Sequence, residues 1–177
     1  MTGSLSGRYC IRAVTPADLP LLHEWRGREH VRRWWGDPSK EPEEEKLREG
    51  RVGMWIAENA GTAFAFLQDY RVSDWSPHHF DGLPEGARGL DLYIGEESHI
   101  GQGHGAAVLT QHAAALFGAG APALGIDPHP DNGAAIRAFE KAGFRQRSGP
   151  VVTAWGGAIL MDRFAPTSMR SPADLEG

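Results

Sequence analysis

The chain has one cysteine, Cys10, among 177 residues. A single thiol cannot form an internal disulfide, so we expect a fold held by its core in a reducing compartment, the cytoplasm. No apolar run is long enough for a signal peptide or a membrane span, and we expect neither. Acidic residues exceed basic ones, 23 to 18, and the net charge of −5 argues against a general basic surface for nucleic acid.

Two common catalytic signatures are also absent. The eight histidines include the adjacent pair His78 and His79, but no His-Glu-x-x-His arrangement, so we expect no catalytic metal. No Gly-x-Ser-x-Gly segment occurs either, which disfavours a Ser-His-Asp hydrolase.

The apolar content of 41% and the length fit one globular domain with a substantial core. We assign this domain to residues 1–164 and expect a loose tail over residues 165–177, where no apolar period is visible. The periodicity predicts strands over residues 9–14, 52–57, 62–70, 88–94, 123–126, 144–147 and 158–164. Helices are expected after Thr15, within residues 27–36 and 41–50, after Gly105 and after Asn132. This order predicts an α+β fold with a mixed sheet.

The segment from Arg88 to Gly105 organises the rest of the chain. Apolar residues alternate with Asp91 and Tyr93, which is typical of a strand with two different faces. Glycines 101, 103 and 105 then precede an Ala-rich helix. Glycines at a helix N-terminus let backbone N–H groups approach a phosphate, where the helix dipole also favours negative charge. The segment therefore predicts an acyl-transfer site for a phosphate-bearing acyl donor.

These glycines lie in a run, IGQGHG at residues 100–105, that resembles the pyrophosphate-binding signature of the GCN5-related N-acetyltransferases (GNATs). That signature is Gln/Arg-x-x-Gly-x-Gly/Ala, and Ile100 departs from its first position. The runs DPHPDN at 127–132 and AFEKAGF at 138–144 resemble the last segment of the same superfamily. With HV at 30–31, WWG at 34–36 and RGLD at 88–91, they resemble the aminoglycoside 6'-N-acetyltransferase branch. The resemblance covers residues 12–164 and implies a central mixed, mostly antiparallel sheet flanked by helices.

Acetyl-CoA is the co-substrate that the resemblance implies. The residues expected to contact it are Tyr93, Ile94, Ile100, Gly101, Gln102, Gly103, His104, Gly105, Ala106, Asn132 and Lys141. Asn132 could equally cap the following helix. The glycines also fit a loose dinucleotide fingerprint, or a plain turn without a ligand; residues 96–100 separate them from the strand, which disfavours the dinucleotide alternative.

For the acceptor side, the resemblance makes Asp91 the catalytic carboxylate and Asp127 a second contact to substrate amino groups. Asp91 could instead pair with Arg88, and Asp127 could form a cap or an Asx-turn. Trp35, Tyr70 and Trp75 are candidate substrate contacts, with core packing as the alternative. The charge run at residues 41–50 is either a solvated helix face or an acidic rim for a polycation.

The predicted reaction moves acetyl from acetyl-CoA to the 6'-amino group of an aminoglycoside, which gives antibiotic resistance. The alternatives are a siderophore-type or protein N-acyltransferase, or a non-catalytic acyl-CoA sensor. We expect a small cationic substrate, no nucleic-acid or membrane partner, and a monomer or homodimer. Relatives commonly carry Tyr where this chain has Phe139, and its hydroxyl is thought to protonate the departing thiolate. That role is absent here or supplied by another group.

Overall fold

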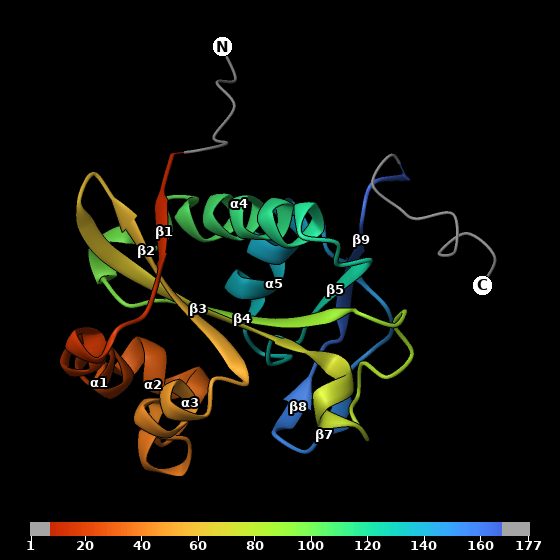
Figure 1. Ribbon diagram of the computed structural model, residues 1–177, viewed down its shortest axis with the longest axis horizontal. Helices are drawn as coiled ribbons and strands as arrows, with labels where there is room; N and C mark the ends of the chain where they lie inside the picture. The colour runs from red at the N-terminus through yellow and green to blue at the C-terminus, as the bar shows by residue number, and fades with distance from the viewer. Residues whose placement is uncertain (1–7, 168–177) are drawn as a thin grey trace.

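The computed structural model describes residues 8–167, which form one seven-stranded sheet and a separate hairpin (Figure 1). The sheet contains β1 (Cys10–Ala13), β2 (Val52–Asn59), β3 (Thr62–Arg71), β4 (Arg88–Ile94), β5 (Ala123–Ile126), β6 (Arg145–Gln146) and β9 (Met161–Phe164). Their order is β1-β2-β3-β4-β5-β9-β6, and only β4 and β5 run parallel. The expected α+β class with a mixed, mostly antiparallel sheet is confirmed.

Helices cover both faces of the sheet. They are α1 (Leu19–Gly27), α2 (Glu29–Trp35), α3 (Glu43–Glu49), α4 (His104–Gly118) and α5 (Gly133–Lys141), with short 3-10 turns η1 (Pro16–Asp18), η2 (Pro38–Lys40), η3 (Val72–Trp75) and η4 (Glu97–His99). Helices α4 and α5 pack on one face around Leu90, Leu109 and Phe144. Helices α1 to α3 lie on the other side (Figure 1), over a core that includes Trp25 and Tyr93. Within residues 8–167, no helix has the length and apolar character to cross a bilayer.

The predicted helix boundaries follow local chemistry. Thr15 N–H donates to the Asp18 carboxylate at 2.8 Å, and the first turn there is 3-10 before α1 begins. The Asn132 side chain accepts from Ala135 N–H at 3.2 Å, so Asn132 caps α5. Gly143 follows the helix with a φ of +90°, the left-handed conformation in which helices commonly end.

Strands β4 and β5 part after a short stretch of pairing. Their register runs from Arg88↔Leu124 to Leu90↔Ile126 and stops there, while β4 stays paired to β3 as far as Ile94. Gly95 N–H donates to Phe64 O at 2.8 Å. Because an antiparallel strand turns alternate residues toward each neighbour, Leu92 and Ile94 direct their N–H and C=O groups away from β3. The fold therefore leaves an open backbone edge beside Asp91.

Three expected boundaries differ from the structure. Strand β2 runs on to Asn59, which shortens the hairpin loop to Ala60 and Gly61, both with positive φ. The single strand expected over residues 158–164 was wrong: Ile159 N–H donates to Pro128 O, and the chain joins the seven-stranded sheet only at Met161. The residues before that point form a hairpin of β7 (Val151–Thr153) and β8 (Gly156–Ala158) that we did not predict.

The tail expected over residues 165–177 is described only at its start. Ala165 is buried in the core and its N–H donates to Pro122 O at 2.9 Å. Residues 168–177 lie outside the described part of the chain, so the single domain over residues 1–164 remains a prediction.

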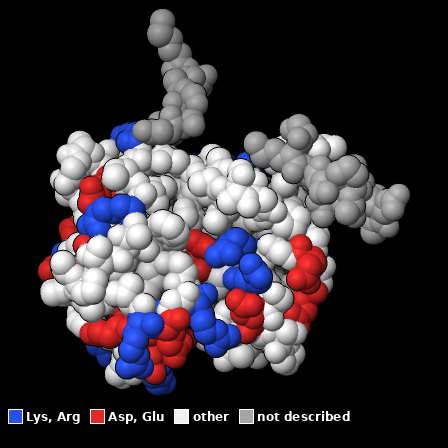
Figure 2. Space-filling view, viewed as in Figure 1, with Lys and Arg blue, Asp and Glu red and all other residues white. Residues whose placement is uncertain are grey.

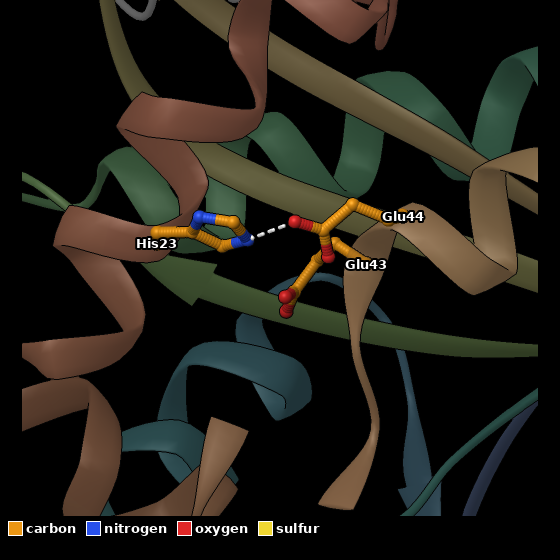
Figure 3. Close-up of side chains that lie close together, drawn as sticks. All are labelled: His23, Glu43 and Glu44. Atoms are coloured by element: carbon orange, nitrogen blue, oxygen red, sulfur yellow. Dashed lines mark ion pairs between the residues drawn. The ribbon is translucent and has the colours of Figure 1, made fainter. Parts of the chain in front are cut away.

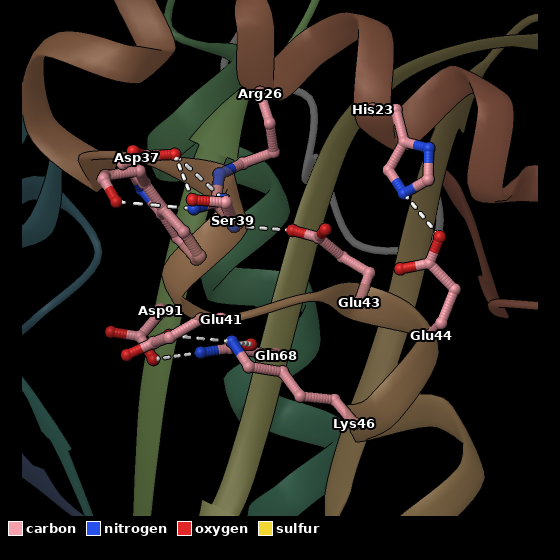
Figure 4. A network of polar contacts seen from close by, with 11 residues as sticks. His23, Arg26, Asp37, Ser39, Glu41, Glu43, Glu44, Lys46, Gln68 and Asp91 are labelled. Carbon is pink, nitrogen blue, oxygen red and sulfur yellow. Dashed lines mark hydrogen bonds and ion pairs between the residues drawn. The ribbon is translucent and has the colours of Figure 1, made fainter.

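A buried ion pair attaches α3 to α1. The Arg26 guanidinium contacts the Glu43 carboxylate at 2.5 Å, and both side chains are almost fully buried. The neighbouring Glu44 pairs with His23 at 2.8 Å on the surface (Figures 3 and 4). His23, Glu43 and Glu44 are the one group of potential metal ligands within the described residues. Because Arg26 already neutralises Glu43, these three residues are better explained as contacts that hold α3 against α1.

We predict that Glu43→Gln lowers the free energy of unfolding by about 3 kcal/mol, because it leaves the Arg26 charge buried and unpaired. Glu44→Gln is the matched control at the next residue, and it should cost less than about 1 kcal/mol because that pair is exposed. Urea unfolding of both variants measures the difference. Equal losses would show that the buried pair does not hold α3 in place.

Candidate active site

A cavity of about 800 Å³ opens between α3, the paired strands β3 and β4, the segment after β5, and the β7–β8 hairpin. Six carboxylates line it, against two lysines, Lys40 and Lys46. The six acids are Asp37, Glu41, Glu45, Glu49, Asp91 and Asp127. Charged side chains of both signs gather around α3 in the lower half of the face shown in Figure 2. The excess of negative charge favours a cationic ligand over an anionic one.

Asp91 lies in this cavity and not in an ion pair with Arg88. Its carboxylate accepts from Gln68 Nε2 at 2.8 Å, while Arg88 pairs with the buried Asp69 behind the sheet. Burial, and next the nearby charge of Asp127, raise the pKa of Asp91 to about 7. A carboxyl with that pKa is poised to exchange a proton near neutral pH.

Asp127 lies just beyond β5 and also lines the cavity. Asn132 caps the following helix, which leaves Asp127 free of that role. His79 Nε2 lies 2.9 Å from Asp127 Oδ2, and both side chains are mostly buried. These two residues are far apart in the sequence and share no motif, and only folding of the 71–86 loop brings them together.

The charge run at residues 41–50 forms one wall of the cavity. Glu45 and Glu49 of α3 both line it, because residues four apart share one face of a helix, and Glu41 lines it from the segment just before α3. Glu43 and Glu44 instead attach the helix to α1. One side of the run is therefore an acidic wall of the cavity, and the other is not simply solvated, because the buried Glu43 pairs with Arg26.

The three aromatic candidates, Trp35, Tyr70 and Trp75, all line the cavity. Trp35 also packs edge-on against Tyr93, with ring centroids 4.8 Å apart. The indole N–H of Trp75 is buried and has no hydrogen-bond partner among the described residues, so it is a free donor for a ligand. Trp155 was not among the predicted contacts; it lines the cavity from the unpredicted hairpin and is 58% exposed.

The glycine turn before α4 is shaped for close approach of a ligand. Gly101 and Gly103 have φ of +72° and +83°, and no heavy atom of the described chain beyond the adjacent residues lies within 4 Å of the position that a Cβ would take at either residue. Ile100 is 45% exposed. The first N–H groups of α4, at His104, Gly105 and Ala106, have no partner within the helix. Open space and free donors at a helix N-terminus fit a pyrophosphate.

Side chains of this turn are already engaged elsewhere. His104 is buried, with its Nδ1 at 2.8 Å from the Tyr9 hydroxyl, and Gln102 donates to Ser98 O. These residues therefore offer their main chain, rather than their side chains, to an anion.

The pairing of β4 does not fit the contact expected between Tyr93 and acetyl-CoA. The strand alternation directs the main chain of Tyr93 at β3, and its ring is buried under α1 and α2. Leu92 and Ile94 face the gap instead, and the Ile94 carbonyl already accepts from His30 Nε2 at 2.9 Å. Asn132 lines the cavity, whereas Lys141 is exposed at the end of α5 and does not.

Comparison with known proteins agrees with this geometry. A family model described as an acetyltransferase (GNAT) domain matches residues 15–149. The chain belongs to the GNAT acetyltransferase family. This GNAT protein is 30% identical over 162 residues to the aminoglycoside N(6')-acetyltransferase type 1 of Klebsiella pneumoniae, covering 85% of this chain and 80% of the relative.

Solved GNAT structures show the same fold. AAC(6')-Ib in complex with paromomycin and acetyl-CoA is 28% identical, with a TM-score of 0.80 over 93% of this chain and 97% of that one. A spermidine N-acetyltransferase from Vibrio cholerae, solved with CoA and spermine, is 13% identical with a TM-score of 0.70, covering 90% of this chain and 97% of that one. The second likeness shows the fold alone.

We predict that Asp127→Asn lowers the pKa of Asp91 by on the order of one unit, because it removes a neighbouring negative charge and leaves the burial unchanged. Carbon-13 NMR of the Asp91 carboxyl during a pH titration measures the shift. Asp131→Asn, a change at an exposed acid in the same segment, is the control and should leave the titration in place. An unchanged curve in Asp127→Asn would mean that the two carboxylates do not interact.

Proposed function

We propose that this enzyme transfers acetyl from acetyl-CoA to the 6'-amino group of an aminoglycoside and so gives antibiotic resistance. One observation carries the proposal: a carboxyl with a pKa near 7 lies in an acidic cavity of about 800 Å³, beside the open backbone edge of β4. The named relatives, aminoglycoside 6'-acetyltransferases with CoA and aminoglycosides in their structures, support this acceptor and this donor.

Charge and size favour a polycationic acceptor. The carboxylates on α3 and Asp127 attract and orient ammonium groups, and the cavity has the volume of a typical small-molecule site. The Trp75 indole N–H and the exposed Trp155 ring add a hydrogen-bond donor and an apolar surface for a sugar. A neutral or singly charged amine would use only part of this cavity.

Asp91 prepares the amine. A protonated amine has no lone pair, so acyl transfer requires that one proton leave the ammonium group. Asp91 accepts this proton, directly or through water, and its raised pKa makes it a better base than an ordinary aspartate. Gln68 holds the carboxylate through its 2.8 Å hydrogen bond during this step.

The space between the diverging strands β4 and β5 fits the acyl donor, acetyl-CoA. Acetyl-CoA supplies the thioester that the amine attacks. The main chain of residues 100–106 offers N–H groups to its pyrophosphate, and the N–H groups of Leu92 and Ile94 face the gap where the thioester carbonyl would be polarised. A cytoplasmic setting remains a prediction, and it suits an enzyme that consumes acetyl-CoA.

We predict that Asp91→Asn lowers kcat by at least about 100-fold and leaves acetyl-CoA affinity within about twofold, because this residue acts on the amine alone. Steady-state rates with kanamycin and calorimetry with acetyl-CoA test the two parts. Near-normal turnover would reduce Asp91 to a structural acid.

A panel containing aminoglycosides, siderophore-type amines and a lysine peptide tests the acceptor class, and acetyl-CoA binding without turnover of any amine would indicate a sensor.

Phe139 lines the cavity and is 6% exposed, in the place where relatives commonly carry Tyr. A thiol has a pKa near 8.5, so CoA can depart as the thiolate without a protein acid. We therefore predict that Phe139→Tyr changes kcat by much less than the ~100-fold that a required general acid contributes. Phe139→Leu is the control for packing. A gain in kcat near 100-fold in the Tyr variant would show that the missing hydroxyl limits the native enzyme.

A further inference from the structure

A chain of polar contacts joins α3 to Asp91 (Figure 4). Lys46 Nζ lies 2.9 Å from Glu41 Oε2 and donates to Gln68 Oε1 at 3.4 Å. Gln68 Nε2 in turn donates to Asp91 Oδ2 at 2.8 Å. Gln68 is 8% exposed and the Lys46 side chain 17%, so the central contacts are largely shielded from water.

The hydrogen bonds from Lys46 through Gln68 to Asp91 run in one direction, which the donors and acceptors of these groups determine. An ammonium group has only donors, an ionised carboxylate has only acceptors, and an amide has one end of each kind. Lys46 therefore selects the amide oxygen of Gln68 and leaves the NH₂ group for Asp91. Without the ammonium, the amide can turn over and direct its oxygen at Asp91, which suits only the protonated carboxyl.

We propose that Lys46 is a positioning residue for Asp91: it orients the Gln68 amide and adds positive charge beside the cavity, and so keeps the carboxylate ionised and ready to accept the proton of the substrate amine. The kinetic consequence rests on the proposed function. The titration of Asp91 in the free protein does not, because it requires no turnover.

Charged and titratable groups face Asp91 from several elements. They are Asp127 with its partner His79, Tyr70 and the Gln68 amide on β3, Lys46 on α3, and Glu41 just before α3. Burial and the charge of Asp127 favour the protonated carboxyl, and Glu41 acts in the same direction. The Gln68 hydrogen bond and the Lys46 charge oppose them. Lys46 is thus the cation that offsets the surrounding acids when no substrate ammonium is bound.

The same positive charge weakens the attraction of a cationic acceptor to the cavity. Removing it should therefore leave the KM unchanged or lower it at pH values where Asp91 is ionised. General damage to α3, which forms a cavity wall, would raise the KM at every pH. This opposite sign separates a positioning role from a merely structural one.

The first test is the carbon-13 NMR titration of Asp91 in the full chain without ligands. Lys46→Met should raise the pKa of Asp91 by on the order of one unit, within the spread seen for Asp in folded proteins. Lys46→Arg keeps the charge and a donor, and should restore most of the native titration. Lys40→Met is the matched control, because Lys40 also lines the cavity but is exposed. No shift in Lys46→Met, or an equal shift in Lys40→Met, would overturn the proposal.

The second test is the pH profile of kcat/KM with kanamycin. The base must be deprotonated, so activity falls as the pH drops through its pKa, and a raised pKa moves this acid limb to higher pH. A shift of one unit lowers kcat/KM about tenfold well below the limb and leaves it near native above. A uniform loss at all pH values, with a raised KM, would show a structural role only.

A double variant tests the route of the effect. In a Gln68→Leu background the amide can no longer be oriented, so adding Lys46→Met should shift the Asp91 titration less than it does in the native chain. An undiminished shift would overturn the role of amide orientation and leave only through-space charge. The NMR readout decides this even if kanamycin is not a substrate.

Discussion

The parting of β4 from β5 after Leu90 and Ile126 is the constraint on which the rest of the site depends. A sheet that stayed paired would satisfy every main-chain group of β4 and leave none of them for a ligand. The divergence instead leaves N–H and C=O groups that need partners, because buried backbone groups are costly when unpaired. His30 supplies one partner for the Ile94 carbonyl. The remaining open edge can offer a ligand the hydrogen bonds that a longer β5 would otherwise take.

Two carboxylates repel each other in the cavity beside this open edge. Asp91 and Asp127 lie in one cavity, where burial and mutual repulsion raise the pKa of Asp91 well above its usual range. Such a group lowers stability when it is ionised: the cost appears as the pH rises from the unfolded pKa toward about 7. Proteins commonly keep such costs at functional sites. Here the contacts of Gln68 and Lys46 limit the cost, and a bound polycation would limit it further.

Local patterns were enough to predict most of the elements. The alternation in residues 88–94, the glycines before α4 and the cap at Asn132 are short-range signals, and the structure places each where its chemistry predicts. The β7–β8 hairpin was missed because its strands are three residues each, and its position depends on the Ile159 contact to Pro128. Trp155 was missed with it, although an isolated aromatic near Gly156 was a weak turn signal.

The sequence by itself determined the order of the elements, the glycine turn before α4 and the presence of an acid within the central strand, because these depend on residues close together in the chain. Only the tertiary structure decided which charges meet. Asp127 and His79, and Lys46, Gln68 and Asp91, come from separate elements. A pKa depends on burial and on charges across space, and neither quantity is encoded in local periodicity. The acidity of Asp91 and the partners that control it are therefore properties of the fold.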